Sequence, residues 1–243
     1  MNIALIGYGK MGKVIEEIAL ERGHTIVAKI SSEFPLSEAD LSLVDVAIEF
    51  SKPDLAVEHI QTCLKLQIPI VVGTTGWSDQ LQEIERAVNQ TNGSLLYASN
   101  FSIGVNIFFE INKRLAQLMS GQPGYSACME EIHHLQKLDA PSGTAITLAN
   151  AILENNTDYG SWVLGEEKVP HTNIGQLGVT SYRKPDVPGT HTIHYSSSVD
   201  TLTISHEAHN RNGFAIGAVI ASEWLLGKKG IYTMNDVLNL NIP

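Results

Sequence analysis

Apolar and polar positions alternate with two different periods along the first hundred residues. Short continuous apolar runs are typical of buried strands. The segments between them repeat apolar residues every three to four positions, as helices that cover a sheet do. The runs lie at 2–6, about 25–30, 44–51, 68–76 and 94–100, with helices between them. Strands alternating with helices predict a doubly wound parallel sheet. We expect Ser78 to be the N-cap of the third helix and Gly93 to follow its end.

The pattern changes after about residue 101. A long amphipathic segment, 105–119, predicts a helix, and 125–134 alternates as a half-buried strand does. Further helices are expected over 141–155 and 213–230. Between them, 169–208 is rich in Thr, Val, His, Tyr and Ile with Gly and Pro punctuation, which predicts several strands of a mixed or antiparallel sheet. The fold class is therefore α/β, with a parallel sheet followed by a second, mixed sheet.

Composition narrows the class of function. The chain of 243 residues carries 26 acidic against 16 basic side chains, a formal net charge of −10. This charge argues against a nucleic-acid or anionic-membrane partner, because both need a basic surface. The two cysteines, Cys63 and Cys128, form neither a disulfide framework nor a zinc signature. No apolar run reaches the length of a membrane span and no signal-peptide pattern opens the sequence, so we expect a cytoplasmic protein.

The turn after the first strand has the sequence GYGKMG. Gly7, Gly9 and Gly12 have the spacing with which a strand–helix turn approaches the pyrophosphate of a dinucleotide. The helix N-terminus would stabilise the negative charge of that group. A plain tight turn is the alternative, but the place of the motif inside a β-α-β unit favours NADH or NADPH as cofactor.

The choice between the two cofactors stays open on the sequence. NAD-binding sites usually have an acidic residue at the end of the second strand, about 20 residues after the glycines. Lys29, Ser31 and Ser32 occupy that region here, and a lysine with hydroxyl groups suits the 2′-phosphate of NADPH. Glu33 follows directly and could still reach the ribose of NADH.

Two further strand ends carry polar residues. GTTG places Gly73, Thr74 and Thr75 after the fourth strand, and YASNF places Asn100 and Phe101 after the fifth. Ligands of open α/β sheets bind at the carboxyl ends of the strands, so both motifs are candidates for cofactor contact. Turn formation and helix capping are the alternative explanation of each motif.

The window EEIHHLQKLDAPSGTA, residues 130–145, gathers groups that acid catalysis and anion binding require. His133 and His134 end a predicted strand, and Lys137 follows within a short loop. Ser142 is the expected N-cap of the next helix, so that the N–H groups of Gly143 and Thr144 would be free to bind a carboxylate. A His-rich loop before a capped helix is one alternative. A metal site is another, but the pattern offers no convincing further ligand.

This window resembles a family signature. HHLQKLDAPSGTA matches every fixed position of H-H-x-x-K-x-D-A-P-S-G-T-A, the pattern of the 4-hydroxy-tetrahydrodipicolinate (dihydrodipicolinate) reductases of lysine and diaminopimelate biosynthesis. The resemblance continues in GYGKMG, GTTG, NFSIGVN, GTHTI and RNGFAIGAV, and so spans nearly the whole chain. The chain departs from the family at Ser31 and Ser32, in the cofactor-selecting region, and at Thr190, where the family has the Glu of GEHT.

The resemblance implies an NADH- or NADPH-dependent reductase that assembles as a homotetramer. Its Rossmann-type domain would comprise 1–101 and 216–243, with an inserted α+β substrate-binding and tetramerisation domain at 102–215. The implied catalytic residues are His133, as proton donor, and Lys137; the implied substrate-binding residues are His134, Gly143 and Thr144. The implied cofactor contacts are Gly7, Tyr8, Gly9, Lys10, Met11, Gly12, Gly73, Thr74, Thr75, Ala98, Ser99, Asn100 and Phe101. No metal is expected.

The expected reaction is hydride transfer to C4 of a cyclic imine dicarboxylate, formed by loss of water from the 4-hydroxy compound, with protonation at C3. A histidine is a suitable general acid near neutral pH, and the cofactor carries the hydride chemistry. Competing hypotheses are a different amino- or imino-acid dehydrogenase and a non-catalytic dinucleotide sensor, which would not need the cluster of His133, His134 and Lys137. The Gly-rich turn argues against a purely structural oligomer.

Overall fold

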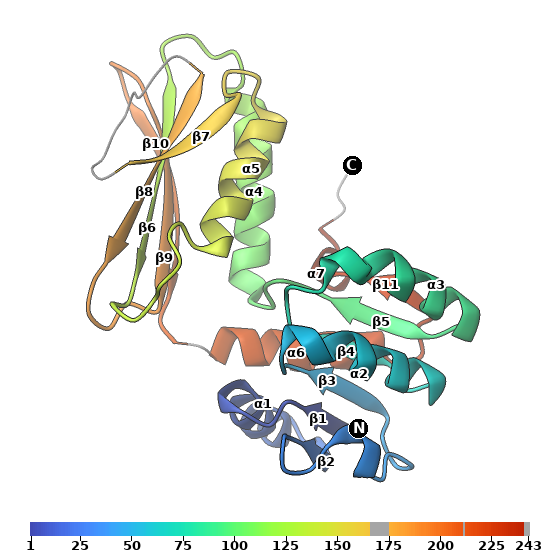
Figure 1. Cartoon of the computed structure of the whole chain (residues 1–243). Coiled ribbons are helices and arrows are strands. Elements are labelled where there is room, and N and C mark those ends of the chain that lie inside the picture. The colour runs from blue at the N-terminus through green and yellow to red at the C-terminus, as the bar shows by residue number, and fades with distance from the viewer. Residues whose placement is uncertain (166–174, 211, 241–243) are drawn as a thin grey trace. The chain divides into compact units, whose positions relative to one another are not determined.

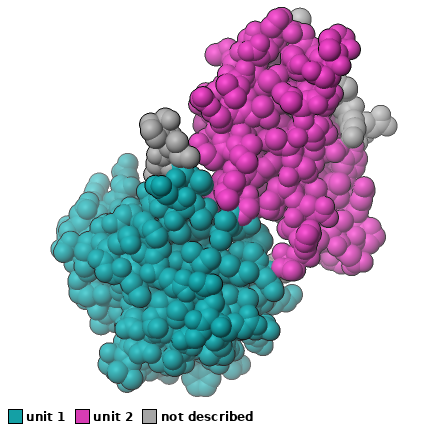
Figure 2. All heavy atoms as spheres, turned by 180° about the vertical axis from the view of Figure 1, so that it is seen from behind, with its two compact units in different colours: residues 1–103, 212–243 teal, residues 104–211 magenta. Residues whose placement is uncertain are grey.

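The chain folds into two compact units. The computed structural model describes residues 1–165, 175–210 and 212–240. Unit 1 comprises 1–103 and 212–243, and unit 2 comprises 104–211 (Figures 1 and 2). The second division lies before the expected boundary at 215/216, because the helix that begins at Asn212 packs along its length against unit 1.

Unit 1 is built on a six-stranded parallel sheet with the strand order β11-β5-β4-β3-β1-β2 (Figure 1). The first strand lies inside the sheet, with β2 on one side and β3 on the other, so the direction of winding reverses at β1. This arrangement confirms the predicted Rossmann-type sheet. The strands are β1 (Asn2–Ile6), β2 (Thr25–Ile30), β3 (Val46–Glu49), β4 (Ile70–Val72), β5 (Ser94–Tyr97) and β11 (Gly230–Tyr232).

Helices cover both faces of this sheet. Neighbouring residues of a strand face opposite sides. Ile3 and Leu5 of β1 therefore pack with α1 and α6, and Ala4 and Ile6 pack with α2 and α3. The helices of unit 1 are α1 (Lys10–Glu21), α2 (Pro53–Lys65), α3 (Leu81–Thr91), α6 (Asn212–Leu225) and α7 (Met234–Val237), with 3₁₀ turns at Leu36–Glu38 and Ser78–Gln80.

The start of α3 differs from the prediction. Ser78 is not the N-cap of this helix; it begins a 3₁₀ turn, and Gln80 precedes α3 without a side-chain cap. The cause is Trp77, which is buried and donates from its indole N–H to the carbonyl of Thr74 at 2.7 Å. Because Trp77 is held in place, the chain forms the 3₁₀ turn before α3 begins. Gly93 does follow the end of α3, as predicted.

Unit 2 is a mixed five-stranded sheet with the order β10-β9-β6-β8-β7, packed on one face against two helices (Figure 1). The central strand β6 pairs parallel with β8 and antiparallel with β9, which confirms the predicted mixed sheet. The part of the predicted strand region at 169–174 lies outside the described residues. The strands are β6 (Ser126–His133), β7 (Ser161–Gly165), β8 (Gln176–Arg183), β9 (Gly189–Ser196) and β10 (Thr201–Ala208), and the helices are α4 (Ile103–Met119) and α5 (Gly143–Asn155).

The end of β6 places ionisable residues on the helix side of this sheet. Alternate residues of β6 are buried: Ala127 and Met129 belong to the apolar core, and Glu131 and His133 continue the same face. An acid and an imidazole therefore occupy positions that the strand period assigns to the core.

Candidate active site

The glycine turn between β1 and α1 has the geometry of a nucleotide-binding turn. Gly7 has φ +95°, and a Cβ there would lie 2.1 Å from the carbonyl oxygen of Phe50. A Cβ on Gly12 would lie 2.6 Å from the carbonyl of Gly7, so this glycine permits close packing of helix on strand. A Cβ on Gly9 would meet nothing within 4 Å, which leaves the backbone there open to a ligand. The three glycines thus fill the three roles of the dinucleotide fingerprint.

A pocket of about 550 Å³ opens beside this turn. Of the thirteen cofactor contacts implied by resemblance, Gly7, Tyr8 and Gly9 line it. The sequence analysis missed the contribution of the segment 50–52, which follows β3, and of His59 on α2. The sequence did contain a signal for this segment. Residues 50–52 follow a buried strand and precede a helix with Pro at its first position. They therefore lie at the carboxyl end of a parallel strand, where ligands of such sheets bind.

Lys29, the cation that the sequence analysis placed near a 2′-phosphate, does not line this pocket. The ammonium of Lys29 lies 2.6 Å from Glu16 Oε1 and 4.8 Å from the centre of the Tyr8 ring, and the Tyr8 hydroxyl donates to Glu16. Lys29 and Tyr8 together lower the pKa of Glu16. Lys52, at the start of α2, lines the pocket instead.

The second predicted part of the cofactor-selecting region is the turn after β2. Ser31 and Ser32 line the pocket, and Glu33 does not. Ser31 Oγ accepts hydrogen bonds from the N–H groups of Glu33 and Phe34 at 3.2 and 3.3 Å, so it also closes this turn.

A cluster of hydrogen-bonded polar residues lies next to the pocket. Glu49 is fully buried at the end of β3; its Oε1 accepts from the N–H of Ser51 at 3.1 Å and from the Ser51 hydroxyl, and lies 3.4 Å from His59 Nδ1. Thr74 Oγ1 also accepts from the N–H of Ser51, at 2.8 Å. The group joins the ends of β3 and β4 to α2.

Three of the remaining predicted cofactor residues have packing or turn contacts in this structure, and cofactor contact by the remaining set stays a prediction. A Cβ on Gly73 would lie 2.2 Å from the ring of Phe50, and Phe101 is buried with its ring centre 5.7 Å from the same ring. Asn100 Oδ1 accepts from the N–H of Ser102 at 2.9 Å. Lys10, Met11, Thr75, Ala98 and Ser99 do not line the pocket.

In unit 2, His133 is the last residue of β6 and is 8% exposed. Its Nδ1 is in close contact with Glu131 Oε2. Its Nε2 faces Gly189, because a Cβ on that glycine would lie 2.9 Å from this nitrogen. The imidazole therefore has one nitrogen against a carboxylate and the other over a residue without a side chain.

Glu131 is fully buried and is the centre of the network around His133. Its Oε1 accepts from Arg183 Nη1 at 3.1 Å and from the N–H of Ser142 at 3.3 Å. Burial by itself would raise the pKa of Glu131, but the interactions with His133, Ser181 and Ser142 outweigh it and lower this pKa to about 2. The carboxylate is therefore ionised at neutral pH.

A second histidine lies against the first. The ring centres of His133 and His191 are 5.1 Å apart, with the planes at 72°. Burial, with a further contribution from His133, lowers the pKa of His191 to about 4, so His191 is neutral near pH 7. Its Nε2 lies 3.0 Å from Ser142 Oγ, which links it to the start of α5.

Lys137 and its loop are tied to the same network. The ammonium of Lys137 lies 2.8 and 2.9 Å from the two carboxylate oxygens of Asp139, and this contact lowers the pKa of Asp139. Arg183 donates to the backbone carbonyls of Lys137 and Asp139 at 3.3 and 2.6 Å. Arg183 thus binds Glu131 and the loop together.

The start of α5 has the predicted capping. Ser142 is the N-cap, and its Oγ accepts from the N–H of Ala145 at 3.2 Å. The N–H groups of Gly143 and Thr144 have no partner within the helix at these positions, so they can receive an anion. A Cβ on Gly143 would meet nothing within 4 Å, and His134 follows β6 with partial exposure.

The donor set also resembles a metal site. Glu131, His133 and His191 offer ligand atoms that all lie within 4.8 Å of one another, a grouping that the sequence pattern did not reveal. However, the guanidinium of Arg183 lies 3.1 Å from the same carboxylate and compensates its charge. The donor set therefore fits a hydrogen-bonded carboxylate–imidazole pair better than a cation site.

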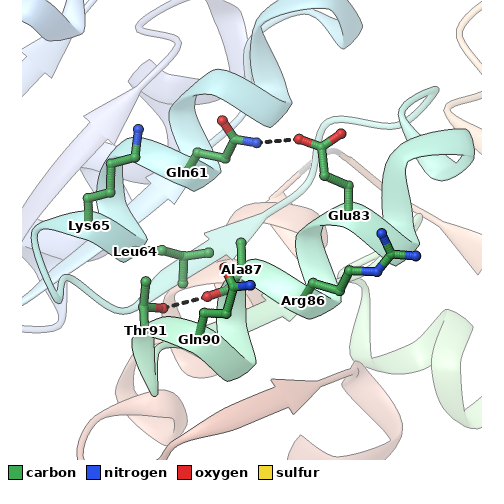
Figure 3. A pocket seen from close by; sticks show the side chains of 8 residues that line it. All are labelled: Gln61, Leu64, Lys65, Glu83, Arg86, Ala87, Gln90 and Thr91. Atoms are coloured by element: carbon green, nitrogen blue, oxygen red, sulfur yellow. Dashed lines mark hydrogen bonds between the residues drawn. The ribbon is translucent and has the colours of Figure 1, made fainter.

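A second pocket of about 370 Å³ lies between α2 and α3 (Figure 3). Gln61 donates to Glu83 at 2.6 Å across it, and Lys65 and Arg86 border it. Predicted site residues do not line this pocket.

Comparison with known proteins identifies relatives that match nearly the whole chain. The chain matches two family models, described as dihydrodipicolinate reductase, N-terminus, over 1–101 and dihydrodipicolinate reductase, C-terminus, over 104–238. It is 49% identical over 239 residues to the 4-hydroxy-tetrahydrodipicolinate reductase of Christiangramia forsetii, which covers 98% of both chains. It is 35% identical over 237 residues to the enzyme of that name from Neisseria gonorrhoeae, covering 93% of this chain and 84% of the relative.

Solved structures share the fold. A dipicolinate-bound dihydrodipicolinate reductase from Paenisporosarcina sp. TG-14 has a TM-score of 0.77 at 24% identity, covering 96% of this chain and 97% of that one. The DAP dehydrogenase of C. glutamicum has a TM-score of 0.55 at 13% identity, covering 100% and 96%. Among the helices described, none has the length and apolar character needed to cross a bilayer. On the evidence of both family models and both close relatives, the chain belongs to the dihydrodipicolinate reductase family.

Proposed function

We propose that this chain reduces the cyclic imine formed from 4-hydroxy-tetrahydrodipicolinate to tetrahydrodipicolinate, with His133 as the proton donor. Its family makes it an NAD(P)H-dependent oxidoreductase of lysine and diaminopimelate biosynthesis. The observation that carries the assignment of roles is the buried pair of Glu131 and His133, next to a helix start suited to a carboxylate. A different amino-acid dehydrogenase has less support, because the solved DAP dehydrogenase shares only the fold.

Each group of unit 2 has a role that follows from its chemistry. The nicotinamide, when bound, supplies the hydride. His133 donates a proton to C3 of the substrate from Nε2, the nitrogen that does not face Glu131. The ammonium of Lys137 exchanges Asp139 for a substrate carboxylate, with His134 beside it. The N–H groups at the start of α5, from Gly143 and Thr144, hold a carboxylate.

For the cofactor we propose a preference for NADPH. The residues that line the unit 1 pocket include Ser31, Ser32, Ser37 and Lys52. A carboxylate lining it, that of Glu58, belongs to α2 and not to the end of β2, where a ribose-binding acid stands. A 2′-phosphate would therefore meet hydroxyls and a cation.

The role of His133 is tested by substitution. His133→Ala should lower kcat for NAD(P)H oxidation by roughly 10²–10⁴-fold, the usual contribution of a general acid, when the imine precursor is generated enzymatically in the assay. His194→Ala is the matched control, because His194 lies on β9 and faces Glu130 at 3.6 Å, away from His133. Near-normal turnover of the His133 variant would remove it from the mechanism.

The cofactor proposal is tested by Ser31→Asp. The aspartate can accept the same two backbone hydrogen bonds as Ser31 and adds the acid that binds a ribose and repels a 2′-phosphate. We expect the ratio of kcat/KM for NADPH to that for NADH to fall at least about tenfold, the size of one charged hydrogen bond. Ser42→Asp, at an exposed position outside the pocket, is the control. An unchanged ratio in the Ser31 variant would contradict the assignment.

We also propose a homotetramer, on the basis of the resemblance to the family. Analytical ultracentrifugation should give a mass of four chains of 26.5 kDa. A single species of one or two chains would refute this assembly.

A further inference from the structure

We infer that Glu131 is a positioning residue for the proton donor. The inference rests on the proposed role of His133 and extends it: a fully buried carboxylate fixes which imidazole nitrogen carries the proton toward the substrate. Arg183 and Ser142 in turn fix this carboxylate. The sequence pattern does not single out Glu131, because Glu131 occupies a core position of β6.

The first step of the argument is the strand geometry. Glu131 and His133 are two residues apart, so both point to the helix side of the sheet. Their side chains meet there, with Glu131 Oε2 in contact with His133 Nδ1. An ionised carboxylate accepts hydrogen bonds and cannot donate them. It therefore holds the proton on Nδ1 of the neutral ring and stabilises the ring when it is charged.

The second step concerns the other ring nitrogen. With Nδ1 against Glu131, Nε2 is the ring nitrogen without a carboxylate contact; it packs on Gly189, where a Cβ would lie 2.9 Å away. Nε2 is therefore the nitrogen that can gain and lose a proton. The neighbouring His191, kept neutral by burial, is joined to Ser142 and does not compete for this role.

The third step is what holds Glu131 itself. A buried carboxylate is costly unless it is fully bonded. Arg183 and the N–H of Ser142 share its Oε1, at 3.1 and 3.3 Å. Arg183 also binds the carbonyls of Lys137 and Asp139. One carboxylate thus connects the proton donor, the lysine loop and the N-cap of α5, so that the three parts of the site keep a fixed geometry.

The inference is tested with Glu131→Gln in the full-length protein. The amide can present its NH₂ group to Nδ1 and so favour the other tautomer. We expect kcat to fall at least tenfold but by less than His133→Ala, while KM for the cofactor is unchanged. Glu130→Gln is the matched control, since it makes the same change one residue earlier on the opposite face of β6. Full turnover of the Glu131 variant would overturn the inference.

A double-mutant cycle separates positioning from a merely structural role. If Glu131 acts through His133, the variant Glu131→Gln/His133→Ala should be no slower than His133→Ala alone. Multiplying losses would instead show an independent, structural effect and would overturn the inference. In ¹⁵N-histidine-labelled protein, the neutral His133 ring should carry its proton on Nδ1, and the Glu131 variant should show the Nε2–H form.

The outcomes also separate this inference from the proposed function. If His133→Ala retains turnover, the proton-donor role fails first. If His133→Ala is slow and Glu131→Gln is normal, only the positioning role fails. An unchanged tautomer in the Glu131 variant would likewise remove the positioning role while leaving the proton donor in place.

Discussion

Gly189 gives the sharpest test of the geometry around His133, the proposed proton donor. It opens β9 and lies directly under the imidazole of His133. In Gly189→Ala the added methyl would lie 2.9 Å from Nε2 and 3.2 Å from Cδ2 of that ring. The backbone of Gly189 is not left-handed, so alanine can adopt it without strain. The perturbation is therefore confined to the space beneath His133.

The size of the effect follows from these distances. Atoms in van der Waals contact are about 3.5–4.0 Å apart, so the ring must move by roughly 0.6 Å or the strand must shift. A misplacement of about 1 Å costs on the order of 10² in rate. We therefore expect Gly189→Ala to lower kcat by roughly 10–10²-fold. The affinity for the cofactor should be unchanged, because Gly189 belongs to unit 2 and the nucleotide turn to unit 1.

The assay is steady-state oxidation of NADPH, combined with thermal unfolding of each variant. Gly160→Ala is the control, because a Cβ at Gly160 would meet nothing within 4 Å. A Gly189 variant that unfolds within a few degrees of the parent protein and turns over at the parental rate would refute the reasoning. It would mean that Nε2 does not need the space above Gly189.

Two further predictions concern substrate binding and pH. Thr144→Val keeps the backbone N–H and removes the hydroxyl, which we expect to donate a further hydrogen bond to the same carboxylate. KM for the imine should therefore rise about tenfold with little change in kcat, since a hydrogen bond to a charged group contributes ~1.5 kcal/mol; an unchanged KM would exclude the hydroxyl from the carboxylate site, and Thr144→Ser should behave as the parent. The pKa of His191 is lowered to about 4 by burial, so the unfolded chain binds a proton first as the pH falls. This contribution to stability is complete above about pH 6.5, declines down to pH 4 and totals on the order of 3 kcal/mol at most. Urea unfolding should give a lower free energy of unfolding at pH 5 than at pH 7 in the parent protein, and a smaller difference in His191→Gln. Equal losses in both proteins would contradict the assignment.

The sheet of unit 1 could be predicted from the sequence because its signals are local. Buried parallel strands read as continuous apolar runs, and each is followed by a helix with its own period. Strand β11 was not predicted, because three residues next to a segment rich in Gly and Lys are too few to show a hydrophobic period. The start of α3 escaped it as well, because burial of Trp77 overrides the capping preference of Ser78.

The candidate site could be predicted only where its residues are neighbours in sequence. His133, Lys137 and the helix start at Ser142 fall in one window, so their chemistry is visible together. Arg183 and His191 come from β8 and β9, and the register of β6 with these strands brings them to Glu131. Nothing in the spacing of the sequence encodes that register. In unit 1, by contrast, Lys29 had the right position, but its ion pair with Glu16 could not be read from the sequence.

The burial of Glu131 is itself an argument that the site is built for a fixed geometry. An exposed carboxylate beside His133 would attract the ring only weakly and would be screened by salt. A buried one interacts more strongly, but it requires Arg183 and the N–H of Ser142 to offset its desolvation. Those same partners belong to β8 and to the N-cap of α5, so the charge compensation of Glu131 also connects the imidazole to the start of α5, the proposed anion site. The partners that stabilise the buried charge of Glu131 thus also keep His133 and the start of α5 in a fixed geometry, as catalysis on a rigid cyclic substrate requires.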